Sequence, residues 1–247
     1  MPHSRQPTIA PFGTWKSPLD SEAVYRKRSS VTELLVDKIT GDVFHIEVSG
    51  FNCARKAVVL LIPDFLHSTY FSLDPTRQDD ASNVRTKVHE YGGGAARVHG
   101  GVAYWSEAKD GRIYRRKVGT GADLRPIEAV TPDCHKHRFA DFDIHPFDNN
   151  LLICIKEDHT DETQVTNGLI LINLKYATMQ EIRSARIDGF YAFPRFGGIH
   201  GDKIAWIEWK HPDMPWNGTE LYYSAFSIPT SKQPIQLCPI KIAGKRS

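Results

Sequence analysis

The chain has 247 residues, of which 40% are hydrophobic and 24% are charged, and its net charge at pH 7 is +2. This composition is typical of a soluble globular protein with a substantial core, and it excludes a chain that is disordered throughout. Because basic and acidic residues are interspersed, the sequence shows no charged surface for nucleic acid or for an anionic membrane. We therefore expect neither as a partner.

Residues 1–14 are expected to form a loose leader. Prolines and polar residues stand where a signal peptide needs an apolar core, which predicts a cytoplasmic protein. The longest apolar run, residues 57–62, is far shorter than the roughly 20 residues of a membrane-spanning helix. The four cysteines form no CxxC pair, which argues against a zinc knuckle or a disulfide scaffold.

The first repeating unit is predicted over residues 15–49. Within it, residues 32–47 (TELLVDKITGDVFHIE) contain two strands around a turn at residues 40–42. Residues 50–82 do not continue this rhythm, because their apolar run has no alternation of period two. The sequence therefore predicts a partial first unit followed by an atypical insert.

The second unit, residues 83–131, shows the pattern most clearly. Three glycines at residues 92–94 precede alternating apolar and polar residues, and turns follow at residues 99–101 and 110–111. Three short antiparallel strands result, with room for a fourth near residues 125–130.

Similar units are predicted at residues 138–185 and 189–243. The repeat of about 45 to 52 residues, built from short strands without a helical period, is typical of β-propeller blades. We therefore expect an all-β fold, a partial β-propeller of about four blades, each a four-stranded antiparallel sheet with its strands in outer-to-inner order. A two-sheet β-sandwich is the competing prediction, because turn spacing alone would also allow it.

Several strings resemble a known family. They are GTWKSPL, NVRTKVHEYGGG, KEDHT, YAFPR and above all IAWIEWKHPDMPWNGTELY. They are similar to the N-terminal β-propeller of the prolyl oligopeptidase (S9) family of serine peptidases, closest to its acylaminoacyl-peptidase and dipeptidyl-aminopeptidase branch. The motif residues expected to have structural roles are Trp15, Tyr91, Gly92, Gly93, Asp158, His159, His211, Pro212, Pro215 and Trp216.

In that family, the propeller covers an α/β-hydrolase domain that carries a serine, aspartate and histidine triad. No serine of this chain lies in Gly-x-Ser-x-Gly, the strained turn that exposes such a nucleophile. The resemblance therefore implies a non-catalytic propeller fragment that gates peptide access to the hydrolase domain, its partner in the intact family. We expect no catalytic residue and no cofactor in this chain.

Arg85 and Glu90 are the candidates for a functional role, as a charged pair facing the propeller channel and the substrate chamber. A structural salt bridge between them is nevertheless the interpretation that we favour for this pair. For Asp158 and His159, turn hydrogen bonding is favoured over acid-base chemistry, because no nucleophile accompanies them.

For two further groups of residues we favour a structural role over a functional one. Cys134, His135 and His137 have the spacing of metal ligands but no second cluster, so a solvated loop is favoured over a metal site. His211, Asp213 and Trp216, in a proline-bounded loop, are expected to anchor that loop against the neighbouring blade rather than contact a ligand.

Two functions of other classes stay open. A free-standing propeller could bind a protein partner through an exposed apolar patch, and a propeller enzyme could hold a metal in its channel. If only four blades are present, their terminal faces should be uncovered, with Ile204, Trp206 and Ile207 expected on such a face. The chain alone should then be oligomeric or poorly soluble.

Overall fold

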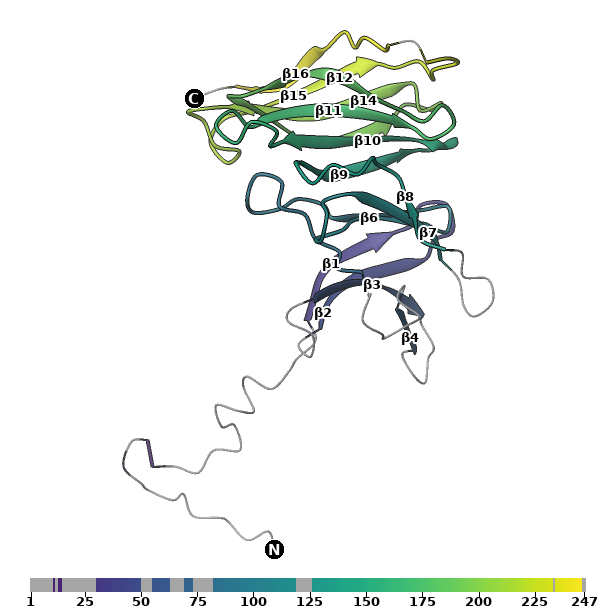
Figure 1. Cartoon of the computed structure of the whole chain (residues 1–247), viewed down its shortest axis with the longest axis vertical. Coiled ribbons are helices and arrows are strands. Elements are labelled where there is room, and N and C mark those ends of the chain that lie inside the picture. Colours follow the sequence, from purple (N-terminus) through teal and green to yellow (C-terminus); the bar gives the residue numbers. More distant parts are fainter. Residues whose placement is uncertain are drawn as a thin grey trace, which may run out of the picture.

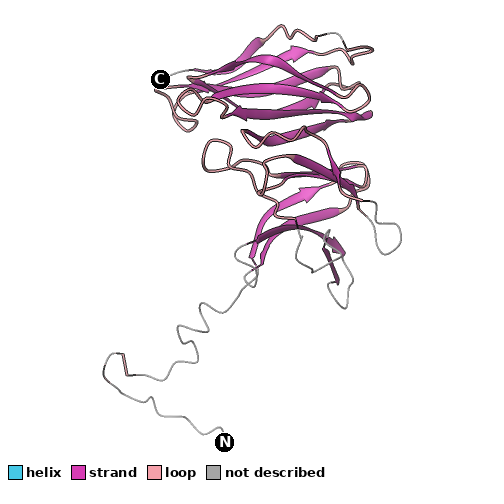
Figure 2. Cartoon of the chain, viewed as in Figure 1, coloured by secondary structure: helices cyan, strands magenta, loops and turns pink. Residues whose placement is uncertain are grey.

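The structure is a computed structural model, and it describes residues 11, 13–14, 30–49, 55–62, 69–72, 82–118, 126–232 and 234–245. Within these residues every regular element is a strand (Figure 2), and no helix is long and apolar enough to cross a membrane. Trp15 and most of the expected leader lie outside the described residues.

The strands form four antiparallel sheets of four strands each, which we call blades 1 to 4. Blades 1, 2 and 3 follow one another in chain order along the molecule (Figure 1), and blade 4 contacts blade 3. Within each blade, consecutive strands are hydrogen-bonded neighbours. Blade 1 contains β1 (Ser30–Val36), β2 (Val43–Ser49), β3 (Arg55–Ile62) and β4 (Thr69–Ser72); blade 2 contains β5 (Ala96–His99), β6 (Val102–Ser106), β7 (Ile113–Lys117) and β8 (Glu128–Ala129); blade 3 contains β9 (His137–His145), β10 (Asp148–Asp158), β11 (Thr166–Asn173) and β12 (Thr178–Arg186); blade 4 contains β13 (Gly189–Gly197), β14 (Lys203–Lys210), β15 (Thr219–Ala225) and β16 (Ile240–Lys245).

The first strand of each blade lies at the inner edge of the arc, because β1 contacts β5, β5 contacts β9 and β9 contacts β13. Four radially arranged sheets are the architecture of a partial β-propeller and not of a two-sheet sandwich. The expected outer-to-inner strand order is wrong, since the chain runs from the inner strand outward. The most apolar strands are the middle ones of each blade, which have a hydrogen-bonded strand on either side, so apolar content does not mark the inner strand.

The stretch that the sequence presented as an atypical insert, residues 50–82, contains two strands of blade 1. β3 pairs with β2 from Val43↔Leu61 to Ser49↔Arg55, and β4 pairs with β3. The apolar run at residues 57–62 has no alternation of period two, but such a run is also consistent with a strand, so the pattern did not exclude β3.

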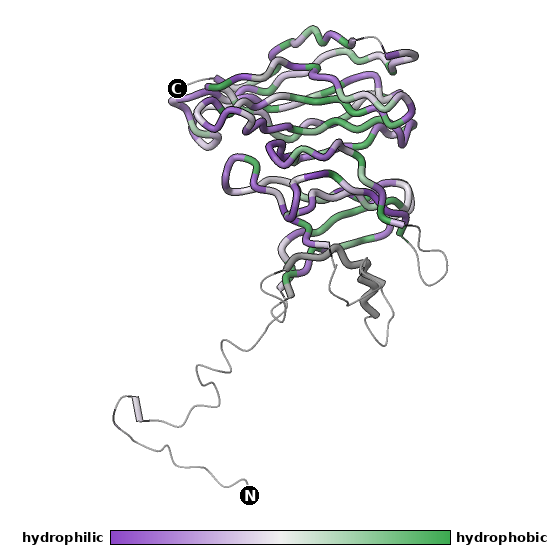
Figure 3. The backbone as a smooth tube through the Cα atoms, viewed as in Figure 1, coloured by the Kyte–Doolittle hydropathy of each residue, from purple (hydrophilic) through white to green (hydrophobic). Residues whose placement is uncertain are grey.

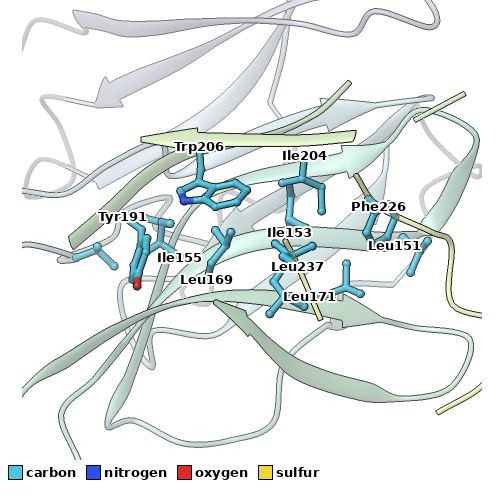
Figure 4. Close-up of a cluster of buried hydrophobic side chains, with 13 residues drawn as sticks. Leu151, Ile153, Ile155, Leu169, Leu171, Tyr191, Ile204, Trp206, Phe226 and Leu237 are labelled. Carbon is cyan, nitrogen blue, oxygen red and sulfur yellow. The ribbon is translucent and has the colours of Figure 1, made fainter. Parts of the chain in front are cut away.

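The core lies between the blades. In β10, Leu151, Ile153 and Ile155 belong to a cluster shared with blade 4, whereas Leu152 and Cys154 belong to a cluster shared with blade 2. Figure 4 shows the first cluster, in which Trp206 and Ile204 of β14 face β10 and β11. Hydrophobic residues accordingly follow the middle of the strands, and hydrophilic residues gather at the turns (Figure 3). Each middle blade therefore buries both of its faces.

The residues expected on an uncovered terminal face are placed differently. Ile204 and Trp206 are 0% and 1% exposed, packed on blade 3, and Ile207 is half-buried. The expectation was wrong because neighbouring residues of a strand point to opposite faces, so Trp206 and Ile207 cannot share one. Exposed apolar side chains of the described residues lie instead on β1, where Leu34 and Val36 are 66% and 52% exposed, and on β16, where Ile240 and Ile242 are 54% and 56% exposed.

A buried carboxylate fastens blade 1 to blade 2. Asp37, which follows β1, accepts hydrogen bonds from the backbone N–H groups of Gly100 at 3.0 Å and Gly101 at 2.7 Å, in the β5–β6 turn. It also accepts one from Ile39 at 2.9 Å. Burial alone would raise the pKa of Asp37, but these backbone donors outweigh it and the pKa is lowered. The charged carboxylate therefore stabilises the interface between the two blades.

Replacing Asp37 by alanine should lower the free energy of unfolding at pH 7 by roughly 3 kcal/mol, because several amide N–H groups lose their acceptor. Because the pKa of Asp37 is lowered in the folded chain, the charged carboxylate stabilises the fold at pH values above the ordinary carboxyl pKa of about 4. This stabilisation is lost as the pH falls below that value. The variant should therefore lose less stability than the parent between pH 5 and pH 3, measured by urea unfolding. Asp42→Ala, in the same turn but exposed, is the control and should change little; equal effects of the two substitutions would contradict this role of Asp37.

The exposed face of β1 should make the chain self-associate when it is produced alone. Uncovered apolar surface forgoes about 25 cal/mol per Å², so contact between copies is favourable. Replacing Leu34 by lysine and Val36 by glutamate should raise the monomer fraction in size-exclusion chromatography with light scattering. Ile199→Lys, at an 86% exposed turn residue of blade 4, is the matched control.

A sharp monomer peak of the unmodified chain, with one cooperative thermal transition, would contradict this prediction. It would show that the described blades cap themselves, and it would favour the free-standing interaction module.

Candidate functional site

A cavity of about 320 Å³ lies where blades 3 and 4 meet the segment that leads into β5. It opens at the end of the blades where β9 and β13 begin and where β10 and β14 end. Its walls combine acidic, imidazole, amide and aromatic side chains. Those that matter for its chemistry are His89, Glu90, Glu157, Asn167, Phe190 and Trp209.

The segment before β5 reaches the cavity through an unusual backbone. His89 and Glu90 both have positive φ angles, 55° and 65°, a region that costs a non-glycine residue roughly 1–2 kcal/mol. The turn is closed by Glu90 N donating to Lys87 O and by Gly92 N donating to Val88 O, each at 2.9 Å. This strained backbone conformation places the side chains of His89 and Glu90 at the cavity.

Two glycines let this segment lie against β9. A Cβ atom on Gly94 would be 2.9 Å from Oδ1 of Asp141, and one on Gly93 would be 3.2 Å from Cβ of Ala140. The backbone N–H of Gly94 donates to Asp141 Oδ1 at 2.6 Å. The glycine run of the sequence is thus explained by close approach to the inner strand of blade 3.

Glu157, at the end of β10, holds the strained turn. It is 4% exposed and accepts a hydrogen bond from the backbone N–H of His89 at 3.0 Å. Glu107 and Glu208 hold matching positions at the ends of the second strands of blades 2 and 4, where they accept from Asn83 N and from Arg183 respectively. A glutamate that accepts hydrogen bonds at the end of the second strand therefore recurs in blades 2, 3 and 4. In blade 3 this glutamate, Glu157, also shapes the cavity.

Arg138 and His159 lie against the acidic groups of the cavity. Arg138 Nη1 lies 2.6 Å from Oε1 of Glu90 and 3.3 Å from Oε2 of Glu157, and His159 Nε2 lies 2.8 Å from Oε2 of Glu157. The hydrogen bond from Arg138 holds the pKa of Glu90 below its ordinary value. Both carboxylates therefore already have a cationic partner in Arg138.

Glu90, Glu157 and His159 also offer ligand atoms within 4.8 Å of one another, the arrangement of a candidate metal site in the described residues. The Arg138 guanidinium, however, contacts both carboxylates and already supplies the positive charge that a cation would bring. The donor set therefore fits an ion-pair network better than a metal site.

Aromatic rings form the opposite wall. Phe190 of β13 and Trp209 of β14 are stacked, with centroids 5.3 Å apart and planes 11° apart. The His89 ring meets Trp209 edge to face at 5.1 Å, and His211 meets Phe190 in the same way at 4.9 Å. This wall offers a flat apolar surface beside polar groups.

The structure separates the two residues that the sequence suggested as a pair. Glu90 pairs with Arg138, whereas Arg85 has an exposed side chain and lines a second cavity of about 190 Å³ together with His135 and His137. The expected Arg85–Glu90 charged pair is therefore wrong for the described residues. The strained turn at His89 and Glu90 directs the two side chains to different cavities.

Asp158 and His159 have different partners although they are adjacent. Asp158 accepts from the Thr160 backbone N–H at 2.9 Å and lies 3.0 Å from Lys156 Nζ and 3.2 Å from His137 Nε2. His159 bonds to Glu157 instead. His137 thus lies beside Asp158 at the start of β9, while Cys134 and His135 precede β9 in a turn.

The proline-bounded loop at residues 211–218 packs on the blade at its first residue and is exposed near its other end. The His211–Pro212 bond is cis, and His211 packs on Phe190. Trp216, which follows Pro215, is 76% exposed, so its expected role as an anchor is wrong. The buried residue of the loop is Asp213, against which Gly218 packs too closely for a side chain.

Sequence reasoning missed His89, Glu157, Asn167, Phe190 and Trp209. A signal for Glu157 was available, because Trp105-Ser106-Glu107 and Trp206-Ile207-Glu208 repeat a glutamate two residues after a large buried residue, and Ile155-Lys156-Glu157 follows the same pattern. The other residues carry no such spacing.

Among known proteins, the chain is similar to solved structures. No family model matches the chain, and no curated protein matches it either. A Mycobacterium tuberculosis puromycin-hydrolyzing peptidase superposes on 97% of this chain with a TM-score of 0.74 and 24% identity. The chain has the fold of part of a peptidase. It spans 35% of that peptidase and 36% of a second structure, a puromycin hydrolase, which superposes on 97% of the chain with a TM-score of 0.75 and 23% identity.

Glu157 and Glu90 should differ sharply in their effect on stability. Glu157→Ala should lower the free energy of unfolding by roughly 3 kcal/mol, because it leaves the His89 N–H and the Arg138 charge without their buried acceptor. Glu90→Ala removes an exposed partner and should cost less than about 1 kcal/mol. Urea unfolding at pH 7 measures the loss of stability in both variants. Equal losses would contradict the role of Glu157 as the buried acceptor that holds the turn.

Proposed function

We propose that this chain is part of the β-propeller of a serine peptidase of the prolyl oligopeptidase family, in its acylaminoacyl-peptidase and dipeptidyl-aminopeptidase branch. In the intact enzyme the propeller would gate the access of short peptides to an α/β-hydrolase domain, which is its partner. The observation that supports this most is the superposition of 97% of the chain on about a third of two peptidases. The family strings of the sequence, such as HPDMPWNGTELY, agree with it.

The chain is proposed to have no catalytic role of its own. The peptidase chemistry requires a nucleophilic serine on a strand-to-helix turn, and these 247 residues contain no Gly-x-Ser-x-Gly. The catalytic serine, aspartate and histidine would belong to the part of such a peptidase that this chain does not match.

A gating role is supported by the polar inner edge of the blades. Arg97 of β5 lies 3.1 Å from Asp143 of β9, and Arg195 of β13 is close enough to Asp143 for that carboxylate to affect its pKa. Burial is the largest effect on Arg195 and lowers the pKa of its guanidinium. An inner edge with these charges favours a water-filled axial channel that passes polar peptides.

Purified chain should release no product from chromogenic acyl-amino-acid or dipeptide substrates above a heat-denatured control. The physical reason is the missing nucleophile. Turnover that survives repurification and is blocked by a serine-directed phosphonate would contradict the non-catalytic assignment.

The family assignment is tested by the genomic sequence that follows the codon of Ser247, read in all frames. It should contain further blade repeats and then a Gly-x-Ser-x-Gly motif. A downstream region without either, combined with a monomeric chain, would contradict the assignment and favour an independent binding module.

A further inference from the structure

The second cavity, of about 190 Å³, lies where blades 2 and 3 meet. It opens at the same end of the blades as the first cavity, because it is formed by the segment before β5, the turn after β6 and the residues at the start of β9. Four cationic side chains line it against two carboxylates, and these are Arg85, Lys87, Lys109, Arg138, Glu107 and Asp110. A concave surface with an excess of one charge concentrates ions of the opposite charge.

The two carboxylates are occupied by hydrogen bonds. Glu107 accepts from the backbone N–H of Asn83 at 3.0 Å with each of its two oxygens. Asp110 accepts from the backbone N–H of Arg112 at 3.0 Å and from the hydroxyl of Tyr114 at 2.7 Å. In the part of the chain that the structure describes, neither carboxylate forms an ion pair with one of the four cations.

Three of the four cations lack an acidic partner within the described residues. Arg138 is engaged at the neighbouring cavity, where its Nη1 lies 2.6 Å from Oε1 of Glu90. Arg85, Lys87 and Lys109 are exposed, and none of them forms an ion pair with a described residue. Lys87 does lower the pKa of Glu90, but by less than the hydrogen bond from Arg138 does. Like charges around one cavity repel each other, so a bound anion would stabilise this arrangement.

The backbone that carries Arg85 and Lys87 is fixed. The N–H of Arg85 donates to the carbonyl oxygen of Ser106 at 3.0 Å, which ties the segment to the end of β6. The carbonyl oxygen of Lys87 accepts from Nη1 of Arg138 at 3.1 Å, which ties the segment to β9. The two side chains therefore project from a segment that is held by both blades, and a ligand needs to order only the side chains.

The turn that carries Lys109 is held in a similar way. It is closed by the N–H of Gly111, which donates to the carbonyl oxygen of Glu107 at 2.9 Å. Gly111 has a φ angle of 74°, and a Cβ atom there would be 2.6 Å from the carbonyl oxygen of His137. Glycine lets the turn approach β9 this closely. The contact between blades 2 and 3 thus brings the three unpaired cations to one cavity.

Uncharged donors and the small volume define the ligand further. The ring of His135, which lines the cavity, carries an N–H in either tautomer. Oγ1 of Thr86 accepts from the N–H of Val88 at 3.3 Å, so its own O–H can donate to a ligand. A volume of about 190 Å³ is below the roughly 300–1,000 Å³ of sites for drug-sized molecules. The cavity therefore suits a small group that accepts several hydrogen bonds.

We propose that this cavity binds a phosphate group. Its oxygens accept from the guanidinium of Arg85, from the ammonium groups of Lys87 and Lys109 and from the hydroxyl of Thr86. A phosphate monoester carries about 1.5 to 2 negative charges at pH 7, whereas a carboxylate carries one and balances less of the charge of three cations. The site does not depend on the peptidase assignment, because every residue that forms it belongs to the described blades. Its ligand is inorganic phosphate or the phosphoryl group of a phosphorylated serine or threonine in a peptide.

The test is an NMR titration of the ¹⁵N-labelled whole chain at pH 7 with N-acetyl-phosphoserinamide, inorganic phosphate and N-acetyl-glutamate amide. The phosphoserinamide should bind at least about fivefold more tightly than the glutamate amide, because it carries the larger charge. The backbone amide signals of residues 85–87 and 109–111 should shift. Binding of inorganic phosphate at least as tight as that of the phosphoserinamide identifies free phosphate as the ligand, and tighter binding of the phosphoserinamide identifies a phosphorylated peptide.

Three variants separate this site from a general attraction to positive charge. Arg85→Gln and Lys109→Gln should each weaken phosphate binding at least about threefold, and together at least about tenfold, because each removes one exposed charge. Unchanged amide signals of β10 and β11 check that the fold is retained. Lys117→Gln removes the same charge at the other end of β7, where the exposed side chain lines neither cavity, and it should leave binding unchanged.

Equal affinity of the phosphoserinamide and the glutamate amide would overturn the proposal in favour of a general carboxylate site. Phosphate binding that survives the double variant Arg85→Gln, Lys109→Gln would also overturn it. The absence of saturable binding of either phosphate probe would do the same, as would an equal loss of binding in Lys117→Gln.

Discussion

Two carboxylates of β9 join three blades at their inner edges. Asp141 accepts from the N–H of Gly94 on one side and from the N–H of Phe193 on the other, at 2.6 and 3.2 Å. Asp143 accepts from Phe196 N and pairs with Arg97. Stacked sheets meet mainly through apolar side chains, which allow sliding, so these directional bonds fix how one blade lies on the next. The placement of blades 2, 3 and 4 at the inner edge, and the shape of the cavity between blades 3 and 4, therefore depend on these two carboxylates.

The cavity is a consequence of the same packing. Its parts come from the segment before β5, from β10 and β11 of blade 3, and from β13 and β14 of blade 4. Glu157 serves two purposes there, since it repeats the joint that Glu107 and Glu208 make in their own blades and also carries the strained turn at His89. A repeated structural residue thus became part of a site in blade 3, where neighbouring blades leave a space instead of filling it.

The blades could be predicted from the sequence because their turns have local signals. Gly41, Gly101 and Gly111 all have positive φ angles, the conformation that glycine adopts without strain, and each lies at a predicted turn. β3 was not predicted, because its apolar run at residues 57–62 lacks the alternation that marks a half-buried strand. The candidate site could not be predicted either: Asn167 and Trp209 are far apart in the chain, and only the stacking of blade 4 on blade 3 brings them together. The strain that sends Glu90 to Arg138 rather than to Arg85 is likewise a property of the folded backbone.

Backbone hydrogen exchange tests the central claim, that the four sheets pack as consecutive blades through the inner strand of blade 3. The informative amides are those of Gly94, Phe193 and Phe196, whose acceptors in the structure are side chains of another blade. Exchange of these amides as slow as that of the ladder amides of β10 and β11 is the predicted result. Exchange at the rate of free amides, while the ladders within each sheet stay protected, would show that the sheets form without packing into a propeller and would contradict the account.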